Sequence, residues 1–349
     1  MIVIEPIRNG QYIMDGAYAL AVQVYVQDQL EITEPVLLPY IVEPTVQVGR
    51  FQNSLVEVNE DYVKDHDILL VRRDTGGGTL YQDPGHVNFC FLYPGNTDIY
   101  GNYAKMYQPT IDALEKFGVK DLSQSGRNDL EIAGKKISGA AMTIKNDLVY
   151  GGFSLMLDVD YDAMVKALNP NEKKIISKGI QSVRARVTDI RSHLAPAYQK
   201  LTNFEFKDLM AAEFLGIEDM SQAKRYDLTD RDWAIIDQMV ADKYKNWDWN
   251  FGNNPTYAIN NAVRAPGIGT IEVSLEVAKG HIQKCRIYGD FFGKKDIADL
   301  EQVLIGQPLR QEPLAELLRD IDLTPYFGLL DPTILINLLL AWYVKMYTY

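Results

Sequence analysis

The chain has 349 residues, of which 47% are hydrophobic and 23% are charged, and its formal net charge is −12. This composition is typical of a folded globular enzyme, and the length favours two domains. The acidic balance argues against a nucleic-acid-binding surface, and two cysteines cannot form a disulfide scaffold.

Helix and strand patterns alternate irregularly through the first 245 residues. Asp15 is placed to cap a first helix, and Gly118 ends a second helix that Pro109 should kink or break. Pro39 and Pro44 should break the early strands. The expected helices are 15–30, 102–117, 161–168, a segment around 172–176, 203–214 and 229–244 with Thr229 as N-cap, and the expected strands are 36–42, 45–48, 68–73, 79–81, 87–93 and a strand region over 129–157 with a turn at 144–148.

The pattern changes after about residue 245. We expect alternating strands at 257–263, 269–277 and 282–288, followed by helices at 296–305, 312–320 and 333–346. The sequence therefore predicts two domains, 1–245 and 246–349. Irregular interleaving of strands and helices predicts an α+β fold with a mixed sheet, not a regular parallel array.

Residues 72–85 read Arg-Arg-Asp-Thr-Gly-Gly-Gly-Thr-Leu-Tyr-Gln-Asp-Pro-Gly and follow an apolar run typical of a buried strand. Consecutive glycines let backbone N–H groups approach a ligand, and such groups can hold phosphate oxygens. Arginines beside them add planar donors that suit phosphate or carboxylate. A glycine-rich turn with surface arginines is the alternative interpretation of this segment alone.

Four further blocks follow in order. They are Ser-Gly-Arg-Asn-Asp-Leu at 125–130, Lys-Lys-Ile-Ser-Gly-Ala-Ala at 135–141, Lys-Gly-Ile-Gln-Ser-Val-Arg-Ala-Arg-Val-Thr at 178–188 and Trp-Asp-Trp-Asn-Phe-Gly at 247–252. Together with residues 72–85, these blocks resemble the ordered signatures of the lipoate–protein ligases. The resemblance covers nearly the whole chain.

The resemblance implies a biotin/lipoate ligase-like catalytic domain on a mixed sheet, with a small α/β C-terminal accessory domain. It implies an enzyme that uses ATP and Mg²⁺ to activate lipoate or octanoate as an acyl-adenylate. The acyl group would then pass to a lysine of the lipoyl domains of 2-oxoacid dehydrogenase E2 subunits or of the glycine-cleavage H protein. Both steps build negative charge on oxygens, so the protein should supply fixed donors and positive charge.

The same resemblance implies roles for particular residues. Lys136 matches the catalytic lysine, which would bridge the substrate carboxylate and the α-phosphate, whereas its neighbour Lys135 should point to the opposite face of the strand. Asp129 is a candidate Mg²⁺ ligand, with a loop-capping role as the alternative. The nucleotide-binding candidates are Arg73, Gly76, Gly77, Gly78, Thr79, Leu80, Tyr81, Asn128, Asp129 and Lys136, and the lipoate-binding candidates are Arg73, Gly78, Lys136, Gly151 and Gly152.

Two segments depart from the family pattern. Residues 82–86 read Gln-Asp-Pro-Gly-His where many members have His-Asp-x-Gly-Asn, and residues 150–155 read Tyr-Gly-Gly-Phe-Ser-Leu where many have His-His-Gly-Thr-Leu-Leu. The second departure removes a histidine, and Phe153 should add bulk to the wall of the acyl pocket. Chain-length preference of the donor is therefore left open.

Three alternatives remain. A related transferase moves lipoyl or octanoyl groups between proteins through a cysteine thioester, but neither Cys90 nor Cys285 lies in a recognisable nucleophile context. A non-catalytic protein could hold lipoate or lipoyl-AMP without turnover, although the presence of Lys136 argues against it. A biotin ligase is disfavoured because its arginines and glycines come in a different order.

The four histidines lack zinc-ligand spacing, so the sequence predicts no zinc site.

Neither end of the sequence predicts a membrane segment. The first residues lack the basic region and apolar core of a signal peptide. The apolar stretch 334–344 is interrupted by Asn337 and is shorter than the ~20 residues that span a bilayer. We therefore expect a cytoplasmic enzyme.

Overall fold

The computed structural model describes residues 1–52, 54–126, 128–145, 147–168, 186–250, 259–278 and 280–346. The chain divides into two compact units. The first comprises Met1–Val48, Leu55–Arg72 and Leu80–Asn250, and the second comprises Gly49–Ser54, Arg73–Thr79 and Phe251–Tyr349. The segment with three consecutive glycines therefore belongs to the same unit as the C-terminal residues.

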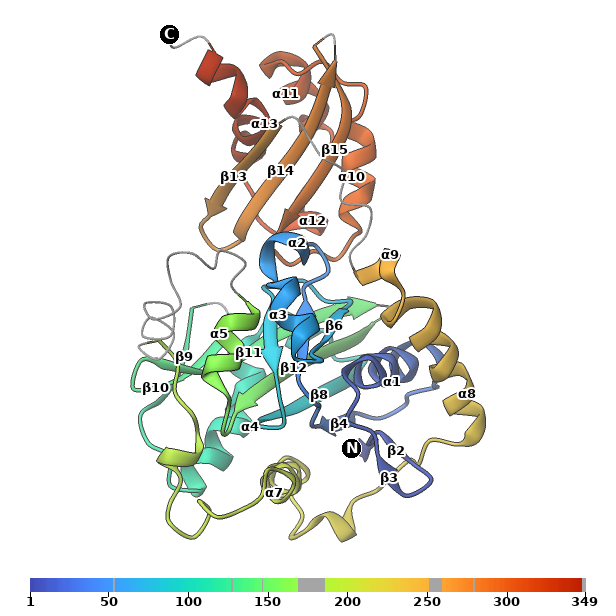
Figure 1. Cartoon of the computed structure of the whole chain (residues 1–349), viewed down its shortest axis with the longest axis vertical. Coiled ribbons are helices and arrows are strands. Elements are labelled where there is room, and N and C mark those ends of the chain that lie inside the picture. The colour runs from blue at the N-terminus through green and yellow to red at the C-terminus, as the bar shows by residue number, and fades with distance from the viewer. Residues whose placement is uncertain are drawn as a thin grey trace. The chain divides into compact units, whose positions relative to one another are not determined.

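A seven-stranded mixed sheet forms the centre of the first unit, in the order β1-β4-β8-β12-β11-β10-β9 (Figure 1). β1 runs parallel to β4, and the remaining neighbours are antiparallel. The strands are β1 Ile2–Val3, β4 Val36–Tyr40, β8 His86–Pro94, β9 Leu122–Ser125, β10 Asp129–Ile132, β11 Lys135–Lys145 and β12 Leu148–Met156.

Helices cover both faces of this sheet because apolar side chains point alternately to either side. On one face, Leu38, Cys90 and Tyr150 pack with α1 and α8. On the other face, Phe89 and Phe153 pack with α4 and α7. The helices are α1 Gly16–Gln29, α4 Tyr103–Lys116, α7 Asn203–Leu215 and α8 Asp230–Met239, the last continued by a π-helical turn at Val240–Tyr244.

A smaller sheet in the order β6-β5-β7 lies in the same unit. It shares a compact apolar cluster with α3 and α5. The elements are β5 Thr45–Val48, β6 Leu69–Arg72, β7 Leu80–Gln82, α2 Ser54–Glu57, α3 Glu60–Asp65 and α5 Tyr161–Ala167. The hairpin β2 Ile7–Arg8 and β3 Gln11–Tyr12, short 3₁₀ turns at Thr97–Ile99, Arg191–His193 and Met220–Gln222, and α9 Trp247–Asn250 complete the described elements of the first unit.

An antiparallel three-stranded sheet and several helices form the second unit (Figure 1). The sheet and helices enclose a separate apolar core. The elements are β13 Ile259–Ala265, β14 Gly269–Ala278, β15 His281–Gly289, α10 Ile297–Leu304, α11 Gln311–Arg319, α12 Thr324–Phe327 and α13 Pro332–Met346. The expected strands-then-helices order of the C-terminal region is confirmed.

Local capping signals in the sequence are confirmed. Asp15 accepts a hydrogen bond from the backbone N–H of Ala17 at the start of α1. Thr229 forms a capping box with Asp232 at the start of α8. Gly118 adopts φ +94° just beyond α4, a conformation that favours glycine.

The breaks expected at Pro109 and Pro39 do not occur. α4 continues through Pro109, and β4 continues through Pro39. A kink at Pro109 stays a prediction. The Leu37 carbonyl accepts a hydrogen bond from the Ile4 N–H, so the backbone groups of Leu37 face the β1 side. Because residues two apart in a strand direct their backbone groups to the same side, the Pro39 nitrogen also faces the β1 side. Among the described residues β1 pairs with Val36 and Leu37 and stops short of Pro39, so the missing N–H removes no ladder bond there.

The helix expected around 172–176 and position 146 of the expected turn lie outside the described residues. Within the described ranges, no helix combines the length and apolarity needed to cross a bilayer.

Candidate active site

The glycine segment, residues 73–79, is built around a buried arginine. Arg73 is 8% exposed. Its Nε donates to Thr75 Oγ1 at 3.2 Å, and its Nη2 donates to the carbonyls of Gly76 and Gly78 at 2.9 and 2.8 Å. In this structure the guanidinium therefore holds the loop in its conformation through hydrogen bonds to the loop's own residues.

The three glycines of this segment do not have the same environment. A Cβ on Gly76 would lie 2.5 Å from the Phe291 carbonyl oxygen. Gly77 has φ +96°, and a Cβ there would lie 2.8 Å from the Phe292 ring. A Cβ on Gly78 would have no atom of the described residues within 4 Å. Packing within the second unit thus requires the first two glycines, whereas the backbone at Gly78 is open to approach.

The residues after the glycines differ in what their side chains can offer. Thr79 Oγ1 donates to Gln52 Oε1 at 2.6 Å. Leu80 and Tyr81 open β7, where they pair with β5. Tyr81 is 4% exposed within the apolar cluster of the smaller sheet, and burial raises the pKa of its hydroxyl. Tyr81 can therefore offer its backbone to a nucleotide, but its ring belongs to the core.

Arg72, the residue before the glycine segment, is bonded to α9. Its backbone N–H donates to Asn250 Oδ1 at 2.8 Å, and its Nη2 donates to the Asn250 carbonyl at 3.0 Å. Its Nε donates to the Trp249 carbonyl at 3.0 Å, and its own carbonyl accepts from Trp249 Nε1 at 2.9 Å. Two motif blocks far apart in sequence are thus joined within the first unit. Positions 251 and 252 of the last block lie outside the described residues.

Lys136 and Asp129 form an ion pair on neighbouring strands, with 2.8 Å between Nζ and Oδ1. Their side chains are 38% and 34% exposed, so ligand can reach both groups. The Lys136 carbonyl accepts from the Thr188 N–H at 3.1 Å, which brings the end of the 178–188 block beside β11. Residues 178–185 of that block lie outside the described residues.

A β-bulge decides which side of the sheet Lys136 faces. Leu130 pairs with Ser138 and Glu131 pairs with Lys136, so β11 has one extra residue at this point. The bulge shifts the alternation, and the Lys136 ammonium comes within 3.0 Å of the position that a Cβ on Gly139 would occupy. Only a glycine leaves that position open.

Lys136 stands at one end of a patch of small residues on β11 and β12. In the register of the pair, Gly139 is opposite Ser154 and Ala141 is opposite Gly152, and directly opposite residues share a face. All four are half-buried. We call Gly139, Ala141, Gly152 and Ser154 the small-residue patch.

The alternate residues of the same strands face the core. A Cβ on Gly151 would lie 2.9 Å from Met142 Cγ and 3.4 Å from Met106 Sδ, so Gly151 leaves room for core packing. Phe153 is 4% exposed and packs with Tyr107 and several phenylalanines. The bulk of Phe153 therefore fills the core face, opposite to the face of Gly152 and Ser154.

Asn128 is hydrogen-bonded to the neighbouring strand β11 and to Tyr107. Its Nδ2 donates to the Ala140 carbonyl at 2.6 Å, and its own carbonyl accepts from the Ala140 N–H at 2.9 Å and from the Tyr107 hydroxyl at 3.2 Å. Asn128 thus fixes the start of β10, directly before Asp129. Its neighbour at position 127 lies outside the described residues. Across the described part of the chain, no cluster of three or more His, Cys, Asp or Glu side chains could hold a metal by itself.

A buried turn at 83–86 anchors the end of β12. Asp83 accepts from the Gly85 and Asp160 N–H groups at 2.9 Å each, and its Oδ1 lies 3.2 Å from His86 Nδ1. Burial raises the pKa of the Asp83 carboxyl, but its hydrogen bonds and the attraction to His86 outweigh burial and leave the pKa below its usual value.

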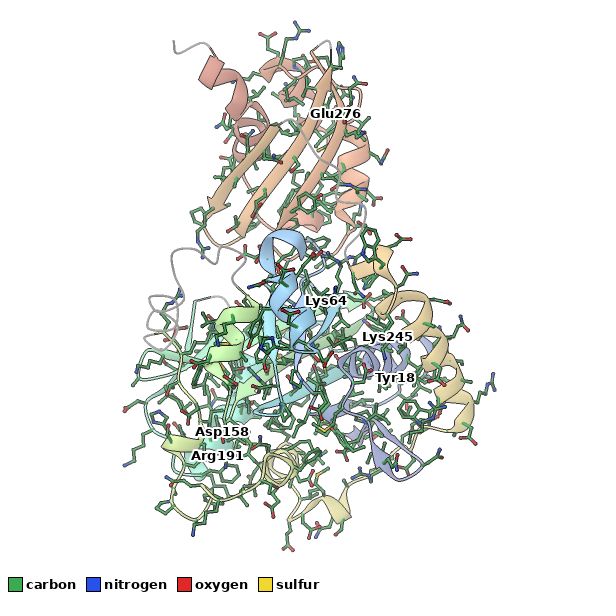
Figure 2. All side chains as sticks on the ribbon, viewed as in Figure 1. Tyr18, Lys64, Asp158, Arg191, Lys245 and Glu276 are labelled. Atoms are coloured by element: carbon green, nitrogen blue, oxygen red, sulfur yellow. The ribbon has the colours of Figure 1, made fainter. Side chains whose placement is uncertain are left out.

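Figure 2 shows Asp158 beside Arg191, an ion pair of 3.1 Å.

Both cysteines are buried. Burial raises the pKa of the Cys90 thiol to about 12 and raises the pKa of the Cys285 thiol far above its usual range. The thiolate is the nucleophilic form of cysteine, so neither side chain is suited to carry an acyl group at neutral pH.

Comparisons with known proteins cover both units. Residues 15–215 match the lipoyl protein ligase A/B catalytic domain, and residues 254–339 match the bacterial lipoate protein ligase C-terminus. The chain is 56% identical to a lipoate–protein ligase of Streptococcus pyogenes, with 94% of this chain and 96% of that protein covered. It is 51% identical to lipoate–protein ligase 2 of Staphylococcus aureus, with 98% and 100% covered.

Solved structures share the fold. A Plasmodium falciparum protein in complex with lipoate has a TM-score of 0.75 at 18% identity, and 99% of each chain is covered. A bipartite lipoate protein ligase from Thermoplasma acidophilum, described with its E2 lipoyl domain, has a TM-score of 0.58 at 25% identity, covering 70% of this chain and 93% of that one. A lipoate–protein ligase A bound with ATP has a TM-score of 0.57 at 21% identity, covering 72% and 98%. The expected α+β fold is confirmed.

Proposed function

Because this chain belongs to the lipoate–protein ligase family, we propose that it forms lipoyl-AMP on the small-residue patch beside Lys136 and then lipoylates a protein. In the first step a carboxylate oxygen of lipoate attacks the α-phosphorus of ATP, and pyrophosphate leaves. In the second step a neutral lysine amine of the acceptor attacks the acyl carbon, and AMP leaves with the bonding electron pair.

The position of the Lys136 ammonium over Gly139 is the observation that carries this proposal. A compact positive charge there can contact both the acid and the phosphate as negative charge moves between them. Asp129 holds the ammonium in place through the 2.8 Å ion pair before substrate arrives. Lys136 is therefore assigned as the catalytic residue.

The small-residue patch would receive the acyl group. Side chains of this size leave room for an aliphatic chain against the sheet, and Gly152 lies two pairs along the register from Gly139, on the same face. Octanoate has the same carboxyl group and an unbranched chain, so we propose that it serves as an alternative donor. Gly151 supports this site indirectly by letting β12 pack against Met142 and Met106.

ATP would be held by backbone and side-chain donors around the glycine segment. We assign Arg73, Gly76, Gly77, Thr79, Leu80 and Tyr81 to nucleotide contacts, with Gly78 contacting both nucleotide and acid. Among the three glycines, Gly78 is the one at which an added Cβ would meet no atom of the described residues within 4 Å. Asn128 orders the strand that carries Asp129.

Mg²⁺ would accompany the triphosphate, since this ion binds through one or two carboxylates together with substrate phosphates. We propose Asp129 as the carboxylate that would join it. When bound, the ion would neutralise phosphate charge, while Lys136 remains the cation that faces the acid.

The proposed acceptors are the lipoyl domains of 2-oxoacid dehydrogenase E2 subunits and the glycine-cleavage H protein. The pairing of the T. acidophilum ligase with an E2 lipoyl domain supports the first of these. We place the enzyme in the cytoplasm. We also propose that residues 1–245 form the catalytic domain and residues 246–349 the accessory domain, with Arg72 hydrogen-bonded to Asn250 of α9 near the boundary.

Mass spectrometry of an acceptor domain tests the reaction and the donor together. The acceptor is incubated with enzyme, Mg-ATP and either lipoate or octanoate, and we expect the mass of one acyl group to be added. Label exchange between pyrophosphate and ATP, dependent on added acid, measures the first step alone. A transferase that moves acyl groups between proteins would show neither result with a free acid.

A further inference from the structure

Ser154 has a buried hydroxyl without a hydrogen-bond partner among the described residues. Its Oγ is shielded from solvent, and no atom of the described residues makes a hydrogen bond with it. Buried polar atoms nearly always have a partner, so each exception needs an explanation. Ser154 is not among the residues that sequence reasoning assigned to the site.

The neighbours of Ser154 explain why the hydroxyl is unpaired. One directly opposite residue, Gly139, has no side chain, and the other is Asn88. The Asn88 amide is already engaged, because its Nδ2 donates to the Tyr40 carbonyl at 3.3 Å and its Oδ1 accepts from Gln82 Nε2 at 2.5 Å. The sheet therefore places the hydroxyl between a residue without a side chain and an amide that is bonded elsewhere.

Ser154 differs from three other unpaired polar residues. Ser54, Thr110 and Trp233 are at most 1% exposed as whole residues, and their polar atoms are enclosed by the core. Ser154 is half-buried and lies on the small-residue patch, where the Lys136 ammonium also stands. Rotation about its single χ1 bond can direct the hydroxyl along that face.

The register brings Ser154 and Lys136 to the same point of the patch. The Lys136 Nζ is 3.0 Å from the Cβ position of Gly139. Ser154 is directly opposite Gly139, at a Cβ separation of about 5 Å for such pairs. A carboxyl group resting over Gly139 would thus have an ammonium on one side and a hydroxyl on the other.

We propose that Ser154 donates a hydrogen bond to the carboxyl group of the acid substrate, and then to the acyl carbonyl oxygen of the adenylate. Lys136 contacts the oxygen that forms the bond to phosphorus, and Ser154 holds the second oxygen. The serine keeps its proton throughout, so it orients the acid and does not transfer a proton. This assignment deepens the proposed function and rests on it.

Matched substitutions of the same shape test the assignment. Ser154→Val and Ser154→Thr add the same bulk, but only threonine keeps the hydroxyl. Because a hydrogen bond to a charged group is lost, we expect Ser154→Val to bind lipoate at least about tenfold more weakly than Ser154→Thr in calorimetric titration. The KM for lipoate in pyrophosphate exchange should rise by a similar factor, with the KM for ATP unchanged.

The stability of the ligand-free variants separates ligand binding from a structural role. If the hydroxyl awaits a ligand, Ser154→Val should melt at the same temperature as Ser154→Thr or higher. If instead the valine variant melts lower and both bind lipoate equally, the assignment is wrong. Absence of lipoate-dependent exchange in the unsubstituted enzyme would contradict the proposed function itself, whereas titration would still report whether the hydroxyl contacts the acid.

Discussion

The two faces of the β11–β12 pair come from alternating residues of the same two strands, yet they are packed in opposite ways. One face carries large apolar side chains that are buried under α4 and α7. The other carries the small-residue patch and the Lys136 ammonium. The buried members of the core face are Ala140, Met142, Gly151, Phe153 and Leu155, and the half-buried members of the patch are Gly139, Ala141, Gly152 and Ser154.

If the proposed site is right, one strand pair serves both folding and catalysis. The core face supplies the apolar burial that fixes the backbone, because buried area is the main stabilising contribution. The patch contributes little to that stability, so its residues can be small enough to leave room for substrate. Substitutions on the two faces should therefore separate activity from stability.

Loss of the ammonium should have the largest effect on activity. Removing Lys136 with Lys136→Ala takes away the charge that faces the acid and the phosphate, and we expect pyrophosphate exchange to fall by at least about a hundredfold. Lys135→Ala is the matched control, since Lys135 is exposed and its loss should be mild. Equal losses in the two variants would contradict the assignment of Lys136.

The largest effect on stability should come from the core face. Phe153→Ala leaves a cavity among packed aromatic rings, and we expect the free energy of unfolding to fall by about 3–5 kcal/mol in urea denaturation. The KM for lipoate should change little, because the ring points away from the patch. A large rise in KM with unchanged stability would instead place Phe153 in the acyl site.

Two glycine substitutions compare the faces directly. In Gly139→Ala the new Cβ would displace the Lys136 ammonium, so exchange should fall by about tenfold with near-normal unfolding. In Gly151→Ala the Cβ would press on Met142, and overpacking should cost about 1–3 kcal/mol of stability. Activity per folded Gly151→Ala molecule should be retained, and the opposite pattern would reverse the assignment of the faces.

The smallest expected effect is on stability, and it concerns the pH dependence of the buried turn at 83–86 that anchors the end of β12. The folded-state pKa of Asp83 is lowered, so its contribution to stability is fully present above the unfolded value of about 3.9 and is lost as pH falls through the lowered folded value. We expect Asp83→Asn to cost about 1 kcal/mol at neutral pH. In urea melts below pH 4, the difference between the variant and the unsubstituted protein should shrink, and a difference that grows would contradict this sign.

Much of the fold could be predicted from local signals. Asp15, Thr229 and Gly118 mark helix ends through hydrogen bonds and backbone angles within a few residues, so they are readable without the fold. Pro39 misled the prediction because its effect depends on whether a strand lies on the side that its nitrogen faces, and β1, on that side, ends before that point. The effect of a proline in a strand is set by its neighbours, not by its own sequence context.

The candidate site divides in the same way. Ordered motifs predicted Lys136, Asp129 and the glycine segment as site residues, because the residue types that suit phosphate and carboxylate are few. The motifs did not point to Ser154 and Gly139, which we propose as further residues of the site. Their position depends on the register of β11 against β12, which no local pattern reveals.

Sequence alone determined the family, the α+β class and the chemical groups available, since these follow from residue types and their order. Tertiary structure decided which face each group meets: a one-residue bulge turned Lys136 onto the patch, and strand register placed Ser154 beside it. The physical reason is the two-residue period of a strand, in which a shift of one position moves a side chain from the core to the opposite face.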